Sequence, residues 1–292
     1  MLYRAQFLMM VPMIKNVLVC LEGSISSESA TRIAIAIARE CKAAIAGLAI
    51  IDEPDIRSGS ATGIGGSSFK HERDESLLAE ARKNASDWVA LFTRRCQAAQ
   101  LATRGLEVVG RPTASIVEEM QSHDLTVIGR DASFRFATNE LDARTRDAIL
   151  HRAPRPILLV PELSQTNGLS RTVLIAYDGS GAAKRAMLSF ATSGLARERD
   201  IHLATVDDVG ELAWRMANQG VQILREAGVH ATLHNIVSPL SNTDALAQLA
   251  KTIGAGLMVM GTFSRSRLAE LFSGSATRGL VEKTTIPLYM QH

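Results

Sequence analysis

Short runs of Val, Ile and Leu alternate along the chain with longer segments in which apolar residues recur at helical spacing. This alternation is typical of an α/β fold built from βαβ units around a buried parallel sheet, because helices cover both faces of such strands. In the second half it predicts strands at 171–177, 200–206, 229–237, 256–261 and 287–291. Helices are predicted there at 181–195, 209–227, 242–254 and 274–284, and in the first half at 26–41, 72–99, 113–122 and 141–152. Ser180 and Ser241 precede predicted helices as N-caps, and Gly228 is expected to end one.

The pattern occurs twice. The segment KNVLVCLEGS at 15–24 returns at 171–180 as RTVLIAYDGS, and DLTVIG at 124–129 returns at 256–261 as GLMVMG. Each half also closes with an apolar run led by a proline, Pro156 or Pro287. The chain is therefore an internal duplication, with a Gly/Ser-rich loop at 58–68 inserted in its first half.

The 292 residues suit two domains, each large enough for its own core. We expect an N-terminal extension at 1–13, a first domain at 14–163, a polar linker at 164–170 and a second domain at 171–292. The extension has no small-residue cleavage site, so we interpret it as a disordered extension or a misassigned start, not as a signal peptide.

Charge and cysteine content narrow the class of protein. The 32 Lys and Arg residues against 30 Asp and Glu leave a net charge of +2, which argues against a nucleic-acid-coating role. No apolar stretch approaches the ~20 residues that span a bilayer, so no membrane association is expected. Cys20, Cys41 and Cys96 match no zinc or disulfide spacing and are expected to be reduced core thiols of a cytoplasmic protein.

Candidate chemistry lies where parallel strands end, because open α/β sheets bind ligands beyond the carboxyl ends of their strands. In the second half these positions are Ala176 to Ser180, Thr205 to Asp207, and Met260 to Gly261. The segment from Gly261 to Ser275 joins a strand to a helix that begins with Gly-Ser, and exposed amides at a helix start are a natural phosphate seat.

At this point the chain resembles the universal stress protein family, whose ATP-binding members carry Gly-x-x-Gly, nine residues, then Gly-Ser or Gly-Thr. The resemblance spans nearly the whole chain and includes the Asp-Gly-Ser that ends the first strand of the second half, 178–180. It implies, for each half, a Rossmann-like domain with a five-stranded parallel sheet of order 3-2-1-4-5. The two domains are expected to be related by a pseudo-twofold axis, with separate sheets whose last strands, at 157–160 and 288–290, lie near the shared interface.

The resemblance also implies a nucleotide site in the second domain. Asp178 would hold the ribose or adenine, and backbone near Val206 would read the adenine edge. The full set of expected binding residues is Ala176, Asp178, Val206, Met260, Gly261, Ser264, Arg265, Gly274, Ser275 and Ala276. The expected ligand is ATP or AMP, with Mg²⁺ accompanying ATP.

One position departs from the family pattern. Ser264 stands where the second glycine belongs, and a side chain there would block close backbone approach or strain a left-handed conformation by ~1–2 kcal/mol. Arg265 and Arg267 are able to compensate by pairing with phosphate, although two loop arginines are more often simply solvated.

The first half departs further. Glu22 replaces Asp178, and Ala132, Asp142 and Ala143 align with Ser264, Gly274 and Ser275. A carboxylate would then occupy the anion seat at the helix start. We therefore expect the first domain to bind no nucleotide and to serve as a structural partner of the second.

Other candidate sites receive structural interpretations. His230 and His234 share one face of a predicted strand at ~13 Å, too far apart to chelate one metal ion. Gly63 to Gly66 follows no strand and reads as a loop, and no phosphate-loop lysine motif or nucleophile–His–acid set is present. Trp88 and Trp214 are expected in the core or at the domain interface.

Three functions are compatible with these patterns. The leading one is a regulatory stress protein that binds an adenine nucleotide and is not an enzyme, with weak ATP hydrolysis left open. The alternative is an interaction scaffold whose sites have decayed in both domains, and a homodimer is possible in either case. An adenylyl transferase is disfavoured, because no Ser-Gly-Gly-x-Asp-Ser or His-x-Gly-His segment occurs.

Overall fold

The computed structural model describes residues 14–58, 67–132, 134, 143–162, 168–206, 210–238, 240–262 and 277–292. The strands are β1 (Asn16–Leu21), β2 (Ala44–Ile51), β3 (Thr103–Val109), β4 (Leu125–Gly129), β5 (Ile157–Val160), β6 (Thr172–Ala176), β7 (Asp200–Val206), β8 (Ala231–Ile236), β9 (Leu257–Gly261) and β10 (Leu288–Gln291). The helices are α1 (Ile25–Cys41), α2 (Glu53–Ser58), α3 (Ser67–Ala98), α4 (Pro112–Met120), α5 (Ala143–Arg152), α6 (Gly181–Thr192), α7 (Gly210–Glu226), α8 (Asn242–Thr252) and α10 (Thr277–Lys283).

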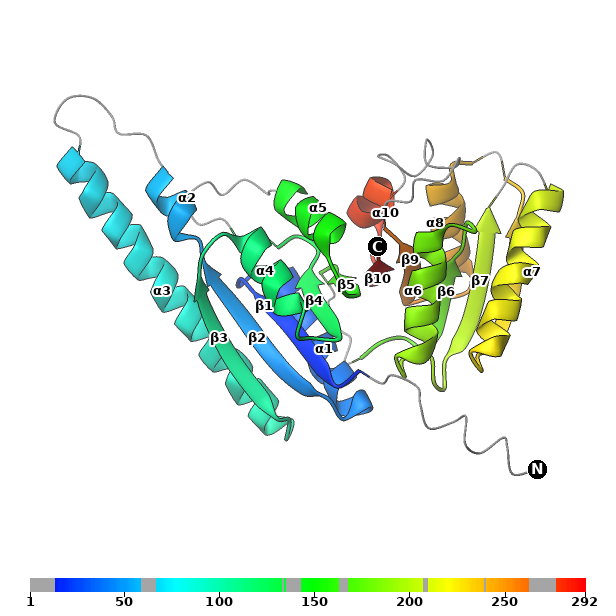
Figure 1. The fold of residues 1–292 in the computed structure, drawn as a ribbon, viewed down its shortest axis with the longest axis horizontal. Coiled ribbons are helices and arrows are strands. Elements are labelled where there is room, and N and C mark those ends of the chain that lie inside the picture. Colours follow the sequence, from blue (N-terminus) through cyan, green and yellow to red (C-terminus); the bar gives the residue numbers. More distant parts are fainter. Residues whose placement is uncertain are drawn as a thin grey trace.

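The strands follow the order β3-β2-β1-β4-β5-β10-β9-β6-β7-β8 (Figure 1). Each half therefore has the predicted order 3-2-1-4-5, with parallel pairing inside the half. The expectation of two separate sheets is wrong, because β5 and β10 pair antiparallel and join the halves into one ten-stranded sheet. Leu288 lies opposite Leu159, and Met290 lies opposite Ile157. Pairing satisfies the backbone groups that an edge strand would otherwise leave open.

Helices cover both faces of this sheet, in three layers (Figure 1). One face packs against α1, α3, α6 and α7, whose buried residues include Ile33, Phe92, Phe190 and Leu224. The other packs against α4, α5, α8 and α10, represented by Ile116, Ile149, Leu246 and Leu280. Both cores run through both halves, so the molecule is one body built from two repeats.

The predicted helix ends are confirmed in the second half. The hydroxyl of Ser180 accepts a hydrogen bond from the amide of Ala183 at 3.1 Å, and that of Ser241 accepts one from Asp244 at 3.2 Å. Gly228 has a φ of +81° just after α7, the left-handed conformation that favours glycine at a helix end.

The region before α3 differs from the prediction. An unpredicted short helix, α2, precedes it, and α3 begins at Ser67 instead of residue 72. Arg57 of α2 links α2 to α3, because its guanidinium contacts Glu53 at 2.6 Å within α2 and Glu75 of α3 at 2.9 Å. Ile56 is buried, so α2 is fixed by packing as well as by charge. The rest of the Gly/Ser-rich loop, 59–66, lies outside the described residues.

The two halves fill the same part of the core with side chains in opposite places. In the first half a Cβ on Gly47 of β2 would lie 2.5 Å from Cδ1 of Phe92 of α3, so the ring occupies the space above the strand. At the matching positions of the second half the large residue is on the strand, Leu203, and the glycine is on the helix, Gly220. A Cβ on Gly220 would lie 2.9 Å from both Leu203 and Tyr177. Each half is thus packed to its own pattern.

The prediction that the three cysteines are thiols of the core is confirmed. Cys20, Cys41 and Cys96 are buried free thiols. Burial raises the pKa of all three, that of Cys41 to about 11, so they remain protonated and unreactive at neutral pH. Within the described ranges, no helix combines the length and apolar character needed to cross a membrane.

The two tryptophans have different environments. Trp88 packs partly buried against the core, as expected. The prediction for Trp214 is wrong, because this side chain is 58% exposed on α7. The described residues of α7 that are buried against the sheet are Ala217, Gly220 and Leu224.

Candidate functional site

The carboxyl ends of β6, β7 and β9 bring the expected second-half residues to one edge of the sheet. Ala176 ends β6, Val206 ends β7, and Met260 and Gly261 end β9. Ala176, Val206 and Gly261 are half-buried, while Met260 belongs to the core. The remaining predicted residues, Ser264, Arg265, Gly274, Ser275 and Ala276, lie outside the described residues, as does Arg267.

Asp178 follows β6 and begins the turn into α6. Its Oδ1 accepts a hydrogen bond from the amide of Ser180 at 2.9 Å, and Gly179 between them has a φ of +77°. This turn fixes the carboxylate at the crevice edge and leaves Oδ2 without a hydrogen-bond partner in the described part of the chain. Asp178 therefore presents one acceptor oxygen to a ligand.

Gly261 has a packing role that its place in the motif does not reveal. A Cβ there would lie 2.5 Å from the amide nitrogen of Ala183 and 2.6 Å from the carbonyl carbon of Ala182. These are backbone atoms in the first turn of α6, which cannot retreat without moving the helix. The glycine thus allows α6 to approach the end of β9.

Thr262, the next residue, is a site residue that the sequence analysis did not select. Its amide donates to the carbonyl of Gln291 at 2.9 Å, continuing the ladder between β9 and β10. The residue is only 2% exposed, and its hydroxyl oxygen has no hydrogen-bond partner among the described residues. Buried hydroxyls are normally hydrogen-bonded, so this one requires an explanation.

At the same edge of the first half, Glu22 and Arg130 are both engaged by other groups of the chain. Glu22, at the position of Asp178, accepts hydrogen bonds from the amide of Ser24 at 3.3 Å and from its hydroxyl. Arg130, at the position of Thr262, pairs with Asp131 at 3.0 Å and 3.1 Å and donates to the carbonyl of Thr284 at 2.6 Å. Arg130 thereby ties the first half to the turn before β10.

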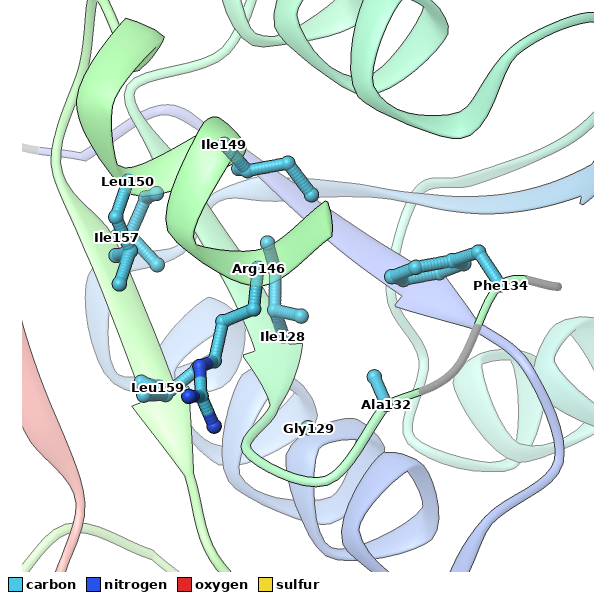
Figure 2. A pocket seen from close by; sticks show the side chains of 9 residues that line it. All are labelled: Ile128, Gly129, Ala132, Phe134, Arg146, Ile149, Leu150, Ile157 and Leu159. Carbon is cyan, nitrogen blue, oxygen red and sulfur yellow. The ribbon is translucent and has the colours of Figure 1, made fainter. Parts of the chain in front are cut away.

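Beside Gly129, on the side of α5, the first half has a cavity of about 10 Å³, room for a single water molecule (Figure 2), whereas a cavity of about 230 Å³ lies between α1 and α3 where β1 ends. Phe134 and Arg146 line it, together with apolar residues of β4, α5 and β5. The Arg146 guanidinium lies 3.5 Å from Asp147 and donates to the carbonyl of Arg130 at 3.4 Å. Ala132 also lines the cavity, whereas Asp142 lies outside the described residues and nothing is described of the Ala143 side chain.

Two further contacts in the second half were missed from sequence. Met216 of α7 lies against Gly179, with its sulfur 3.2 Å from where a Cβ would be. His234 contacts His202 of the neighbouring strand, Nε2 to Nδ1 at 2.9 Å, instead of sharing a site with His230. Burial, and secondarily the charge of His202, lower the pKa of His234. Among the described residues no three His, Cys, Asp or Glu side chains are grouped to hold a metal ion.

Comparison with known proteins identifies the fold's family. A sequence model of the universal stress protein family matches residues 13–161 and again 170–292. The chain belongs to the universal stress protein family. It is 29% identical over 168 residues to universal stress protein Slr1230 of Synechocystis sp., and the match covers 56% of this chain and 56% of that relative's length.

Solved universal stress proteins share the architecture. A universal stress protein from Archaeoglobus fulgidus DSM 4304 superimposes with a TM-score of 0.69 at 16% identity, covering 94% of this chain and 97% of that one. A putative universal stress protein from Pseudomonas aeruginosa UCBPP-PA14 gives 0.54 at 14% identity, covering 95% and 93%. At these identities the likeness establishes the fold alone. This universal stress protein therefore carries two family units in one chain, as its internal repeat predicts.

Proposed function

We propose that the second half of this universal stress protein binds an adenine nucleotide, ATP or AMP, and that the protein acts in a stress response as a regulator, not as an enzyme. The first half serves as its structural partner. The proposal rests on differences between the two repeats, which share one backbone plan and differ in the chemistry at the carboxyl ends of their strands.

The observation that carries the proposal is the buried hydroxyl of Thr262. Its oxygen lacks a partner within the described residues, although leaving a buried polar group unsatisfied costs about 1–3 kcal/mol. The first half avoids this cost at the matching position, because Arg130 donates hydrogen bonds to Asp131 and to the carbonyl of Thr284. A bound phosphate oxygen would accept the hydrogen bond that Thr262 has to give.

The neighbouring groups fit the rest of a nucleotide. The unused Oδ2 of Asp178 is an acceptor for a ribose hydroxyl or an adenine amine, and the backbone that ends β7 at Val206 offers polar groups to the base edge. Gly261 and Thr262 border the segment 263–276, which would complete the phosphate seat. Mg²⁺ bound with ATP would supply charge neutralisation for the phosphates.

Isothermal titration with ATP and Mg²⁺ tests the proposal. Asp178→Ala should weaken binding by about tenfold, the value of one hydrogen bond to a charged group, and Thr262→Val, which keeps the shape, by about fivefold. The melting temperature without ligand should hardly change in either variant. Asp200→Ala is the matched control, since this exposed carboxylate lies at the opposite end of β7 and should leave binding intact.

Absence of heat and of any thermal shift at millimolar ATP would favour the alternative, an interaction scaffold with decayed sites. Binding that survives Asp178→Ala would mean that the nucleotide sits elsewhere. A phosphate-release assay on the same samples tests the proposal that the protein is a regulator and not an enzyme. We expect at most very slow hydrolysis of ATP.

A further inference from the structure

A polar cavity lies at the junction of the two halves, away from the carboxyl end of β6. It is partly open to solvent and has a volume of about 180 Å³ between the turn before β5, the end of β10 and the last turns of α6. Residues of both halves line it, because β5 and β10 are the strands that join the sheet (Figure 1). We call it the inter-half cavity.

The internal repeat shows that this cavity is a departure from the common plan. All five of its second-half residues, on α6, at its C-cap and on β10, are polar: Ser189, Thr192, Ser193, Tyr289 and Gln291. The repeat-related residues on α1 and β5 are Ile33, Ala36, Ile37, Leu158 and Val160, all apolar and all but Ala36 buried. The same place in the fold is thus filled by apolar side chains in the first half and by side chains with hydroxyl and amide groups in the second half.

Three groups at the inter-half cavity have unused hydrogen-bonding capacity. The Oε1 atom of Gln291 is buried and has no hydrogen-bond partner in the described chain. Asp124 accepts hydrogen bonds from the amides of Lys15 and Asn16 through Oδ2, at 2.8 Å and 3.0 Å, and its Oδ1 has no partner among the described residues. Arg155 makes no hydrogen bond or ion pair with another described residue.

These groups combine one cation with two acceptors, one of them anionic. We propose that the inter-half cavity binds a small zwitterion, namely an α-amino acid. Its carboxylate pairs with the Arg155 guanidinium, which is suited to bidentate contact with a carboxylate. Its ammonium donates to Asp124 Oδ1 and to Gln291 Oε1, which removes the unsatisfied acceptor.

The size of the space agrees with this class of ligand. A volume of about 180 Å³, against about 10 Å³ for the one-water cavity beside Gly129, is ample for one molecule of about ten non-hydrogen atoms. For so small a ligand we expect a Kd of about 0.1–1 mM. Because both halves contribute contacts, the bound amino acid should stabilise their junction.

The test is a thermal-shift screen of the common α-amino acids at millimolar concentration on the full chain, followed by calorimetry of each compound that raises the melting temperature. Arg155→Ala should weaken binding at least about tenfold. Arg152→Ala, an exposed arginine three residues earlier that does not line the cavity, should bind as the unchanged protein does. Gln291→Val, which installs the residue of the first half, should also weaken binding.

Two analogues of the best amino acid test its zwitterionic recognition. The methyl ester keeps the ammonium and loses the carboxylate, while the 2-hydroxy acid keeps the carboxylate and loses the ammonium, and each should bind at least about tenfold more weakly. The proposal is overturned if no amino acid shifts the melting temperature, which would mean that water alone fills the cavity. It is equally overturned if binding persists in Arg155→Ala or if both analogues bind as well as the parent. Thr262 of the proposed nucleotide site donates to the carbonyl of Gln291, so Arg155→Ala, a change two strands away from Gly261 and outside that site, is the variant that separates this outcome from the ATP titration.

Discussion

Replacing Gly47 with leucine should destabilise the protein by about 1–3 kcal/mol, because β2 has no room for a side chain there. A Cβ would lie 2.5 Å from Cδ1 of Phe92 and 2.9 Å from Cδ1 of Leu21. Carbon atoms in contact are normally about 3.5–4.0 Å apart, so the ring would have to move by about 1 Å. Phe92 is only 1% exposed, so its ring has to displace buried neighbours or turn into the cavity of about 230 Å³ that it lines with Trp88 and Leu91.

The opposite change, Phe92→Gly, should cost more. Removing a buried phenylalanine side chain costs about 3–5 kcal/mol, and a glycine inside a helix adds about 0.5–1 kcal/mol. Leu21→Tyr alone overfills the site by a further 1–3 kcal/mol or so. If these effects were independent, the triple variant would lose about 5–12 kcal/mol, comparable to the whole stability of a typical domain.

The triple variant Leu21→Tyr, Gly47→Leu and Phe92→Gly instead recreates the packing that Tyr177, Leu203 and Gly220 have in the second half. We therefore expect it to lose no more than about 3 kcal/mol, with a favourable coupling of several kcal/mol.

Equilibrium unfolding in urea measures this coupling. Trp88 lies against Gly23 in the first half, so its fluorescence in a Trp214→Phe background reports on the half that carries the changes. The reasoning is refuted if the triple variant loses as much stability as the sum of the three single variants. That result would show that an exchange of large and small residues between strand and helix does not refill the core.

Three other predictions test the junction, the histidine pair and the thiols. Arg130→Met should lower the free energy of unfolding by about 1–3 kcal/mol, since it leaves the carbonyl of Thr284 without its partner, whereas Arg171→Met, an exposed surface cation, should have almost no effect in the same melts. The pKa of His234 is lowered in the folded protein, so below the ordinary value of 6.5 the unfolded chain binds more protons than the folded one. The free energy of unfolding should therefore decrease as the pH is lowered below 6.5. His234→Gln should make this decrease smaller, and His230→Gln should not. A colorimetric thiol reagent at pH 8 should find no reactive cysteine until urea is added; rapid reaction of the native protein would contradict the burial of Cys20, Cys41 and Cys96.

The pattern of apolar residues predicts the elements and their order within each half, because buried parallel strands and amphipathic helices have distinct periods. It does not predict that β5 and β10 pair. The apolar runs led by Pro156 and Pro287 indicate buried strands, but local pattern carries no information on which neighbour covers an edge. Whether the two last strands pack side by side as separate sheets or pair by hydrogen bonds depends on contacts between residues far apart in the sequence.

The candidate site, too, could be predicted only in part from the sequence. Alignment of the two repeats shows that Glu22 takes the place of Asp178 and that Arg130 takes the place of Thr262. Only the structure shows that the Thr262 hydroxyl is buried without a partner among the described residues, whereas Arg130 is hydrogen-bonded. The contact of His202 with His234 could not be predicted, because it depends on the register that sets Ala204 opposite His234.

The glycine that ends the fourth strand of each half limits what a motif can prove. A Cβ on Gly129 would lie 2.6 Å from the hydroxyl oxygen of Ser26 and 2.7 Å from the amide nitrogen of Ser27, just as one on Gly261 would meet the first turn of α6. Both halves therefore need this glycine so that a helix can approach the sheet, whether or not a nucleotide binds. Its presence in a phosphate-binding pattern is explained by packing alone. The case for a nucleotide must rest on Asp178 and Thr262, the positions at which the two halves differ, and these are the residues whose replacement decides it.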